Sequence, residues 1–510
     1  METKILFIYP DIGGNSIDFS PAIEVLSGFL KNKGFLVDLI HIHDQSDTKL
    51  DYDEIFSKVS KSNPDIIGIT STTYQYDISN KICYEIKNRG VNVPVFLGGI
   101  HATIAPYDLK DSYFDAFCIG EGELPLTDIL TRIKNKEDIY TTRGFHFKKD
   151  GNIITNPNGD IVENLDDIPF RDYEIMNTKK LLQLKNNWLS IAFSRGCLYD
   201  CNFCINQKLK KIYNFDKKMK YFRVMSVERT MDELLHLLNT YSPLIKVINL
   251  DDDLIILDKE WFFKFADEYE ERIYKPFSIK YAINGRANLL DEPTIKRLKE
   301  SGCELVRVGF ETGNNDMRNL ILKKGISDKQ LNDVFYYFNK YKLRSLAFTM
   351  IGIPGETEET IKDSINMLIR LKPTLIRMAI FEPFIGTPLY DYCRDKKLIK
   401  EIDTSNCFEN SSLIFDDLDE FALKKYSLLF PWYLNISLLE LEYKNQYIKL
   451  IDKFENKLKL LSDIAVIKEE VLDADKEISL ILKRNNIEHF EYFSKNNFYY
   501  HFYSEMEEDE

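Results

Sequence analysis

The sequence predicts an α/β protein in three parts: a doubly wound parallel sheet, a partial (β/α)6 barrel and a mainly helical C-terminal region. Strand and helix patterns alternate up to about residue 145, and a second alternating series with six strands begins near residue 190. After residue 400 the patterns are helical. We therefore expect domains over 1–145, 190–400 and 401–510, with a linker rich in Asn, Asp, Gly and Pro over 146–189.

The first domain is predicted from short apolar runs separated by amphipathic segments. The expected strands are KILFIYP (4–10), FLVDLIHI (35–42), DIIGITS (65–71), VPVFLGG (93–99) and a short one within FDAFCIGEGE (114–123). The expected helices lie within residues 20–34, 51–64 and 76–90. Ligands of such sheets bind beyond the carboxyl ends of the strands, so the loops that follow these strands are the expected binding region.

The barrel is predicted from six β/α repeats. Its expected strands are LSIAFS (189–194), IKVINLDD (245–252), FSIKYAIN (277–284), LVRVGFE (305–311), RSLAFTMIG (344–352) and TLIRMAIF (374–381). Helical patterns such as DEPTIKRLKESG (291–302) and DKQLNDVFYYFNKYK (328–342) separate the later strands. In a parallel barrel the site forms at the carboxyl ends of the strands.

Composition and charge narrow the class of protein. The chain has 510 residues, of which 44% are hydrophobic and 29% charged, as is typical of globular proteins. A formal net charge of −14 argues against broad binding to nucleic acid or an anionic membrane. The basic run at 208–220 is interpreted as a solvated surface segment, with contact to an anionic substrate as the alternative. No signal peptide and no membrane span are predicted, and we expect a cytoplasmic protein.

Three of the eight cysteines fall within eight residues, in the stretch SRGCLYDCNFC (194–204). Cys197, Cys201 and Cys204 follow the first barrel strand, so they lie in the first loop at the barrel mouth. Three thiolates on one loop suit three irons of a 4Fe-4S cluster and leave the fourth iron open for a ligand. A structural zinc site is the alternative, but the nearest later cysteine or histidine candidates, His236 and Cys303, are distant in sequence.

The pattern Cys-x3-Cys-x2-Cys, with Phe203 directly before the last cysteine, resembles the signature of the radical S-adenosylmethionine (radical SAM) enzymes. The resemblance implies that these cysteines hold the cluster and that the open iron binds S-adenosylmethionine. Later segments resemble the family in the same order: NLDDDLII (249–256), NGRANLL (284–290), VGFETG (308–313), MIGIPGET (350–357) and FEPFIGTPLY (381–390).

The resemblance also implies which residues contact S-adenosylmethionine. Asp251 and Asp252 are expected at its amino group, with a solvated acidic turn as the alternative, and Arg286 is expected at its carboxylate. Glu311 matches an acidic residue that the family places near the same ligand. Gly352 and Gly355 permit close backbone approach to the adenine, on which Ile353 can pack.

The first domain resembles the cobalamin (B12)-binding, Rossmann-like domain that precedes the barrel in one radical SAM subgroup. The matching segments are IIGITSTTY (66–74), VFLGGIHATIAP (95–106) and FCIGEGE (117–123). The residues that the resemblance implies as cobalamin contacts are Gly13, Ser71, Thr72, Gly98, Gly99, His101, Glu121 and Glu123. An ordinary doubly wound domain without a ligand is the alternative.

The loop after the first strand departs from many cobalamin domains. They carry Asp-x-His-x-x-Gly there, with the histidine bound to cobalt, whereas this chain reads IYPDIGGN (8–15) with Pro10 in the place of the histidine. A bound cobalamin is therefore expected to lack a histidine lower ligand from this loop.

The resemblance extends over residues 1–400 and implies a cobalamin-dependent radical SAM methyltransferase. In such an enzyme a 5′-deoxyadenosyl radical activates an unactivated carbon and methylcobalamin donates the methyl group. A reductant such as flavodoxin or ferredoxin and a small-molecule or peptide substrate are the implied partners. One alternative is a rearrangement, cyclisation or oxidation on the same scaffold without methyl transfer. The other is a non-catalytic, cluster-bearing sensor, which would not need the MIGIPGET and VGFETG segments.

Overall fold

The computed structural model describes residues 2–12, 17–213, 220–400, 411–460, 464–493 and 499–504. Gly13, Cys407, residues 214–219 of the basic run and the acidic tail at 505–510 lie outside these ranges. The chain divides into two compact units, and each is described here by itself. The first unit comprises residues 1–198 and 205–255, and the second comprises residues 199–204 and 256–510.

The first unit contains the predicted parallel sheet, with the order β2-β1-β3-β4-β5-β6-β7 among the described strands. Strands β1 to β5 pair in parallel, whereas β6 and β7 form an antiparallel hairpin at one edge. The bounds are β1 (Lys4–Pro10), β2 (Leu36–Ile42), β3 (Ile66–Thr70), β4 (Val95–Gly98), β5 (Ala116–Cys118), β6 (Phe145–Lys149) and β7 (Asn152–Thr155). The hairpin lies in the expected linker, so part of that segment extends the sheet.

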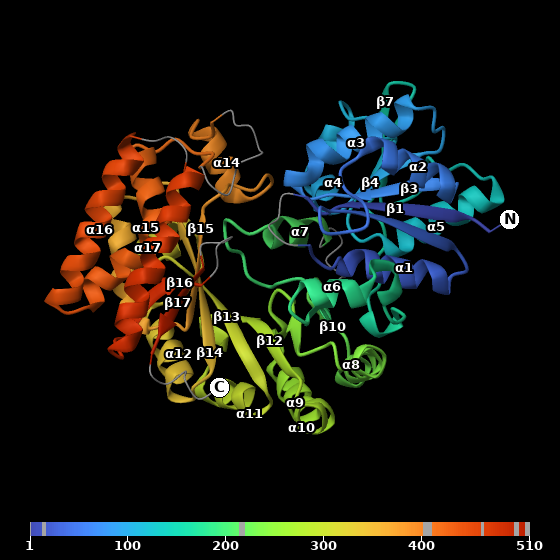
Figure 1. Cartoon of the computed structure of the whole chain (residues 1–510). Helices are drawn as coiled ribbons and strands as arrows, with labels where there is room; N and C mark the ends of the chain where they lie inside the picture. Colours follow the sequence, from blue (N-terminus) through green and yellow to red (C-terminus); the bar gives the residue numbers. More distant parts are fainter. Residues whose placement is uncertain are drawn as a thin grey trace. The chain divides into compact units, whose positions relative to one another are not determined.

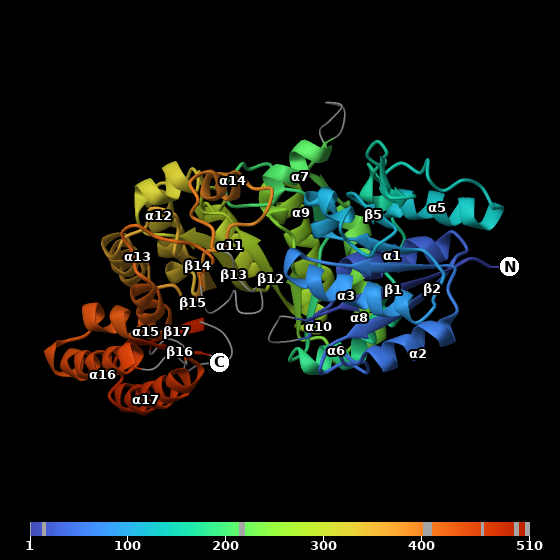
Figure 2. The same cartoon turned by 90° about the horizontal axis from the view of Figure 1, so that it is seen from above.

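Helices cover both faces of this sheet, as the doubly wound prediction requires. Helices α1 and α5 lie on one face and α2 and α3 on the other (Figures 1 and 2). The bounds are α1 (Pro21–Asn32), α2 (Tyr52–Ser62), α3 (Tyr76–Asn88), α4 (Ile100–Ile104) and α5 (Glu123–Asn135). Local sequence sets their ends: the Asp51 carboxylate, for example, accepts the backbone N–H groups of Asp53 and Glu54 at the start of α2.

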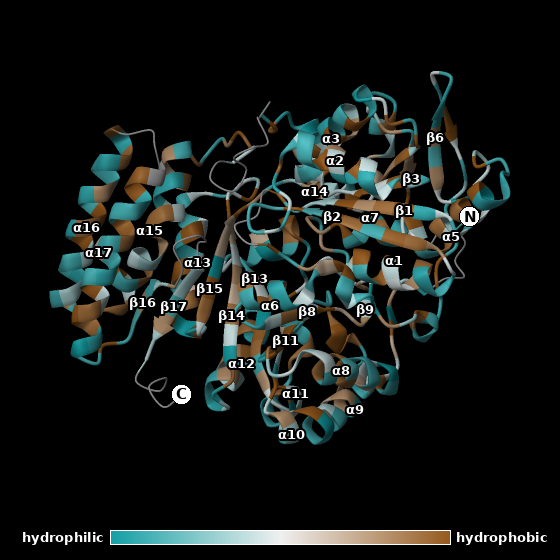
Figure 3. Ribbon diagram, turned by 45° about the vertical axis from the view of Figure 1, so that its right-hand side comes forward, coloured by the Kyte–Doolittle hydropathy of each residue, from teal (hydrophilic) through white to brown (hydrophobic). Residues whose placement is uncertain are grey.

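The core of this unit is aliphatic and lies between the strands and their helices. Strand residues such as Ile8, Ile69 and Leu97 are fully or almost fully buried, and Cys83 of α3 is buried among them. Figure 3 shows β1 largely in the hydrophobic colour, whereas the helices that cover the sheet carry both colours. Cys83 and Cys118 are both free and buried, as is usual for cysteines that pack as small apolar side chains.

The first unit also contains the start of the barrel. Strands β8 (Trp188–Ile191) and β11 (Val247–Leu250) pair in parallel, with Ile191 beside Leu250. The remaining elements are α6 (Thr178–Leu184), β9 (Ser194–Arg195), α7 (Asn206–Tyr213), β10 (Arg223–Val224) and α8 (Val227–Tyr241). Strands β9 and β10 form a short antiparallel pair that flanks the cysteine-rich stretch.

The second unit contains the other four predicted barrel strands, which pair in parallel in chain order. They are β12 (Lys280–Gly285), β13 (Cys303–Glu311), β14 (Arg344–Ile351) and β15 (Leu375–Ile380). The accompanying helices are α9 (Lys259–Tyr269), α10 (Lys275–Phe277), α11 (Glu292–Glu300), α12 (Asp328–Lys340), α13 (Glu358–Leu371) and α14 (Pro388–Asp395). All six predicted barrel strands are thus confirmed.

The C-terminal region is mainly helical, as predicted, with α15 (Glu420–Leu438), α16 (Leu441–Leu460) and α17 (Ile464–Arg484) side by side (Figures 1 and 2). Two strands, β16 (His489–Tyr492) and β17 (Tyr499–Tyr503), were not predicted, and β17 pairs antiparallel with β15. Within the described residues, no helix combines the length and the apolar character that a bilayer span requires.

Candidate functional site

The first unit contains a cavity of about 350 Å³ that reaches the carboxyl ends of β3, β4 and β5. Side chains of α1 and the strands give it apolar walls, and glycines open its strand side. Its lining includes Phe7, Ala22, Leu26, Gly68, Phe96, Gly98, Gly99, Cys118, Gly120 and Leu126. A cavity of this size and character is typical of a small-molecule or cofactor site.

Two glycines shape the strand side of this cavity in different ways. Gly99 has a φ of +90°, and a Cβ there would lie 2.8 Å from the carbonyl oxygen of Ser71, so the turn requires glycine. A Cβ at Gly98 would meet nothing within 4 Å, because that position faces open space.

Three other expected cobalamin contacts, Ser71, Thr72 and His101, are not among the residues that line this cavity. Ser71 is buried, and its hydroxyl donates to the carbonyl of Thr72 at 2.7 Å. The Thr72 backbone N–H donates to Gln75 Oε1 at 3.0 Å. His101 is buried against Tyr76, with ring centroids 3.9 Å apart, and its Nε2 lies 3.2 Å from the Asp108 carboxylate. Burial lowers the pKa of His101 to about 4, which favours a neutral imidazole.

Glu121 and Glu123 line the cavity but are paired with arginines. Arg195 Nη1 lies 2.6 Å from a Glu121 oxygen, and its Nη2 lies 2.5 Å from Glu123 Oε1. Arg223 also pairs with Glu121. Burial by itself would raise the pKa of Glu123, but the Arg195 guanidinium holds it below its usual value. The carboxylates therefore fix Arg195, two residues before Cys197, at the cavity wall.

The start of the cysteine-rich stretch is fixed to the end of β11. The Asp252 carboxylate accepts the backbone N–H of Phe193 at 2.9 Å and both the N–H and the hydroxyl of Ser194, at 2.5 and 2.6 Å. Burial raises the pKa of Asp252 to about 6. Asp251 is exposed, whereas Asp252 is buried and serves the loop.

The backbone turns sharply just before the first cysteine. Gly196 has a φ of +90°, and a Cβ there would lie 2.5 Å from the Tyr221 carbonyl oxygen. Cys197 follows and is buried. The turn and the Asp252 contacts together define the path of the chain into the cysteine-rich stretch.

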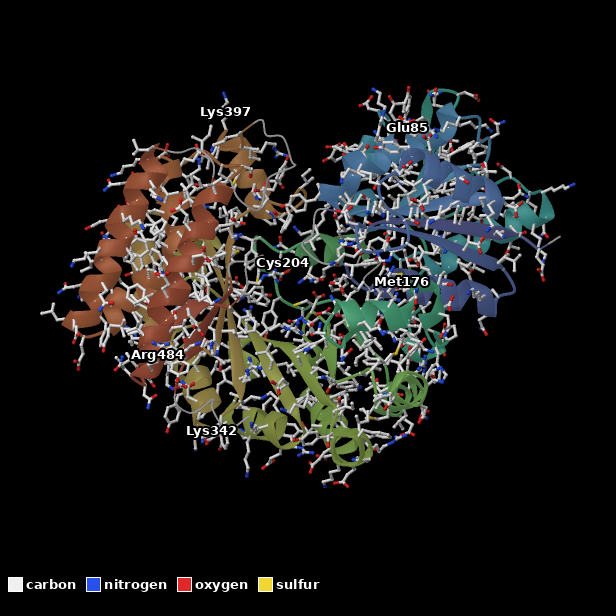
Figure 4. The ribbon with its side chains drawn as sticks, in the orientation of Figure 1. Glu85, Met176, Cys204, Lys342, Lys397 and Arg484 are labelled. Carbon is white, nitrogen blue, oxygen red and sulfur yellow. The ribbon has the colours of Figure 1, made fainter. Side chains whose placement is uncertain are left out.

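The second unit holds the rest of this stretch. Asn202 anchors this part of the stretch with two hydrogen bonds. The Asn202 backbone N–H donates to the Leu322 carbonyl at 3.0 Å, and the Asn202 side-chain amide donates to the Ile321 carbonyl at 2.9 Å. Cys201 is buried and Cys204, labelled in Figure 4, is partly exposed. Within the described ranges no three His, Cys, Asp or Glu side chains are already gathered as a metal site. The three cysteines therefore stay candidate ligands.

Arg286 contacts this stretch instead of standing open to a ligand. Its Nη1 donates to Cys201 Sγ at 3.6 Å, and its guanidinium lies 3.7 Å from the centroid of the Tyr199 ring. Its Nη2 donates to the backbone carbonyl of Lys324.

Glu311 forms a buried ion pair with Lys324, a residue that sequence reasoning missed. Glu311 has a φ of +64° at an irregularity of the β13–β14 pairing, a conformation that is strained for a non-glycine residue. A Cβ at Gly309 would collide with both charged groups, so glycine there makes room for the pair. The Lys324 ammonium lies 5.8 Å from the centroid of the Phe203 ring.

The loop after β14 is held by Glu356, which sequence reasoning also missed. Its Oε2 accepts the backbone N–H groups of Gly352 and Ile353, at 2.5 and 3.2 Å. Gly352 and Gly355 have φ values of +80° and +81°, and a Cβ at Gly355 would meet nothing within 4 Å. Ile353 is fully buried among apolar residues that include Met317, Leu322 and Phe381.

Comparison with known proteins gives two family matches. Residues 19–130 match the model of the B12 binding domain, and residues 191–368 match that of the radical SAM superfamily. The cavity lies largely within the first match, and the three cysteines lie in the second.

Individual relatives cover most of the chain at modest identity. An uncharacterized methyltransferase of Pyrococcus horikoshii is 29% identical over 353 residues, which are 69% of this chain and 74% of the relative. The anaerobic magnesium-protoporphyrin IX monomethyl ester cyclase of Rubrivivax gelatinosus is 25% identical over 79% of this chain and 72% of its own. The solved structure of the radical SAM methyltransferase TsrM from Kitasatospora setae, with cobalamin and a 4Fe-4S cluster bound, shares the fold. Its TM-score is 0.63 at 17% identity, over 78% of this chain and 75% of that one.

Proposed function

We propose, on the premise that this chain belongs to the radical SAM enzymes with a B12-binding domain, that it transfers a methyl group to an unactivated carbon of its substrate. One observation carries the proposal. The chain combines a glycine-lined cavity in its B12-binding domain with the Cys-x3-Cys-x2-Cys pattern at the start of its radical SAM domain. A cobalamin held in this cavity would supply the methyl group that the transfer requires.

The cavity fits part of a cobalamin. Its apolar walls suit a flat aromatic group, and the open space at Gly98 lets a ligand approach the backbone of β4. Arg195, which lines the same cavity, is held by Glu121 and Glu123. We assign these carboxylates to holding Arg195 and not to direct contact with the corrin. The described residue Pro10 offers no cobalt ligand.

The donor set fits an iron–sulfur cluster. Cys197, Cys201 and Cys204 supply soft thiolate ligands. The Asp252 carboxylate fixes the backbone shortly before the first cysteine, and Asn202 anchors the segment between the second and the third. The Arg286 guanidinium beside Cys201 balances negative charge on a thiolate-bound cluster.

The remaining groups fit S-adenosylmethionine. Lys324 and Glu311 offer a cation for its carboxylate and an anion for its amino group. The open backbone at Gly355 suits the flat adenine. Ile353 is buried in the apolar core next to this loop, so we assign it to packing that holds the loop in place.

When bound, the cluster and S-adenosylmethionine supply one-electron chemistry that removes a hydrogen atom from carbon, and cobalamin supplies the methyl group. The chain's own residues hold these groups, orient them and exclude water. Hydrogen-atom removal needs no side chain as a base, so an unactivated carbon is within reach of this chemistry.

The second candidate function is a cyclisation or oxidation on the same scaffold. It is favoured by the similarity to the Rubrivivax cyclase, which covers more of this chain than the match to the Pyrococcus methyltransferase. Product analysis separates the two functions, because methyl transfer adds one carbon atom to the product, whereas cyclisation and oxidation add none.

The experiment that tests the proposal is anaerobic purification with cobalamin supplied, followed by reconstitution with iron and sulfide. We expect iron and corrin bound to the chain, and 5′-deoxyadenosine formed on reduction in the presence of S-adenosylmethionine. Iron and 5′-deoxyadenosine without corrin would contradict methyl transfer and favour the second candidate. Zinc in place of iron would contradict both, as would a fully loaded enzyme that forms no 5′-deoxyadenosine, the result expected of a sensor.

A further inference from the structure

We propose that Arg286 is a positioning residue that holds the segment around Cys201 and sets the reduction potential of the cluster bound there. The inference rests on the proposed function, which places the cluster at Cys201. It departs from the sequence prediction, which assigned Arg286 to the carboxylate of S-adenosylmethionine.

The contacts of Arg286 engage both terminal nitrogens of its guanidinium and one of its faces. Nη1 donates to Cys201 Sγ, Nη2 donates to the Lys324 carbonyl, and the Tyr199 ring covers one face. The side chain is 6% exposed, and its Nε is buried without a hydrogen-bond partner in the described part of the chain. The geometry therefore directs the charge of Arg286 at the cysteine, and its buried Nε N–H stays available to an acceptor that the bound cofactors bring.

The segment after β12 contacts the cysteine-rich stretch at a second point. Asn288 Nδ2 donates to the Tyr199 hydroxyl at 2.7 Å, so the Tyr199 ring is fixed at its edge by Asn288 and at its face by Arg286. The rigid end of a buried strand thus sets the position of Tyr199, two residues before Cys201. This is the arrangement expected of residues that orient a metal ligand.

The electrostatic consequence has a definite sign. Reduction adds a negative charge to the cluster, and a hydrogen bond to a ligating sulfur together with a nearby positive charge stabilises the reduced state. Because Arg286 is buried, its charge is only weakly screened by solvent. The Arg286 contact therefore raises the reduction potential, and its loss makes the cluster harder to reduce.

The test compares three variants with the wild type after anaerobic reconstitution, with cluster potential measured by EPR-monitored redox titration. In Arg286→Met we expect the ratio of reduced to oxidised cluster at a fixed potential to fall at least tenfold, which is about 59 mV for a one-electron couple. Arg286→Lys keeps the charge but not the forked donors, and should recover part of the shift. Arg394→Met, which removes an exposed charge from α14, should leave the potential unchanged.

A fourth variant keeps the inference testable if Arg286→Met does not fold. Tyr199→Leu retains the guanidinium but removes the ring that orients it, and the potential should fall by less than in Arg286→Met.

The possible outcomes separate this inference from the function on which it rests. An iron-loaded Arg286→Met enzyme with the wild-type potential would overturn the inference alone, even if its iron content were low, because a merely structural role changes loading and not potential. A wild-type chain that takes up no iron would overturn the proposed function and this inference with it.

Discussion

At the scale of single residues, the buried carboxyl group of Glu356 holds the loop after β14 in the candidate site. Burial raises the pKa of Glu356 to about 8, although two backbone N–H groups that donate to it oppose this shift. The folded chain therefore binds this proton more tightly than the unfolded chain. The resulting stabilisation is complete below about pH 4.5 and is lost as the pH rises through about 8.

The prediction is a difference in pH dependence between wild type and Glu356→Gln. A one-proton difference gives a slope of up to about 1.4 kcal/mol per pH unit, so wild-type unfolding free energy should fall relative to Glu356→Gln between pH 5 and 8. Urea unfolding at several pH values measures it. Glu359→Gln removes an 81% exposed carboxylate and is the matched control. Parallel pH profiles for wild type and Glu356→Gln would contradict the assignment.

Gly309 gives a second prediction at this scale. The methyl group of Gly309→Ala would meet the ends of Lys324 and Glu311, which are flexible side chains that can move away. We therefore expect a small loss of stability but about tenfold weaker binding of S-adenosylmethionine, because the charged pair that we propose as its contact is displaced. Isothermal titration of the reconstituted enzyme checks this. Unchanged affinity would remove Lys324 and Glu311 from the binding site.

At the scale of elements, the turn between β4 and α4 offers a matched pair of glycines. Gly99→Ala places a methyl against the fixed backbone of Ser71 at a positive φ, so we expect a loss of about 2–4 kcal/mol in unfolding free energy. Gly98→Ala projects its methyl into open space at the cavity, so stability should hold while cobalamin affinity falls. Thermal unfolding and cobalamin titration of both variants test this. Full cobalamin affinity in Gly98→Ala would place the ligand elsewhere.

Most elements could be predicted from the sequence because strand and helix patterns are local, and the strands of both series are where the alternation indicated. The Asp150-Gly151 dipeptide is a hairpin signal in the sequence, and both residues adopt a positive φ between β6 and β7. The composition of the segment predicts a linker instead, so the hairpin differs from the prediction. Strand β17 could not be foreseen, because its place depends on pairing with β15, more than a hundred residues earlier.

The site divides in the same way between what is local and what is not. The glycine turns at Gly99, Gly352 and Gly355 could be predicted, because each needs only its own backbone conformation. The Asp252 carboxylate and the Arg286 guanidinium both contact the cysteine-rich stretch. These contacts join residues far apart in the sequence, so a local sequence pattern does not predict them. The role of Lys324 could not be predicted, because its ion pair with Glu311 depends on the irregular pairing at the end of β13, which the sequence does not indicate.

At the scale of the whole molecule, the division into two compact units makes the effect of a ligand local. Cobalamin that binds the cavity should stabilise the folded first unit, by about 2.7 kcal/mol at a free concentration one hundred times Kd. Hydrogen exchange should therefore slow in β3, β4, β5 and α5, and exchange in α16 and α17 should change little, because these helices belong to the second unit. Gly98→Ala, at the same cobalamin concentration, should show less protection in the first unit. Protection confined to the C-terminal helices would instead locate the corrin in the second unit, and the cavity at the ends of β3, β4 and β5 would then need a different ligand.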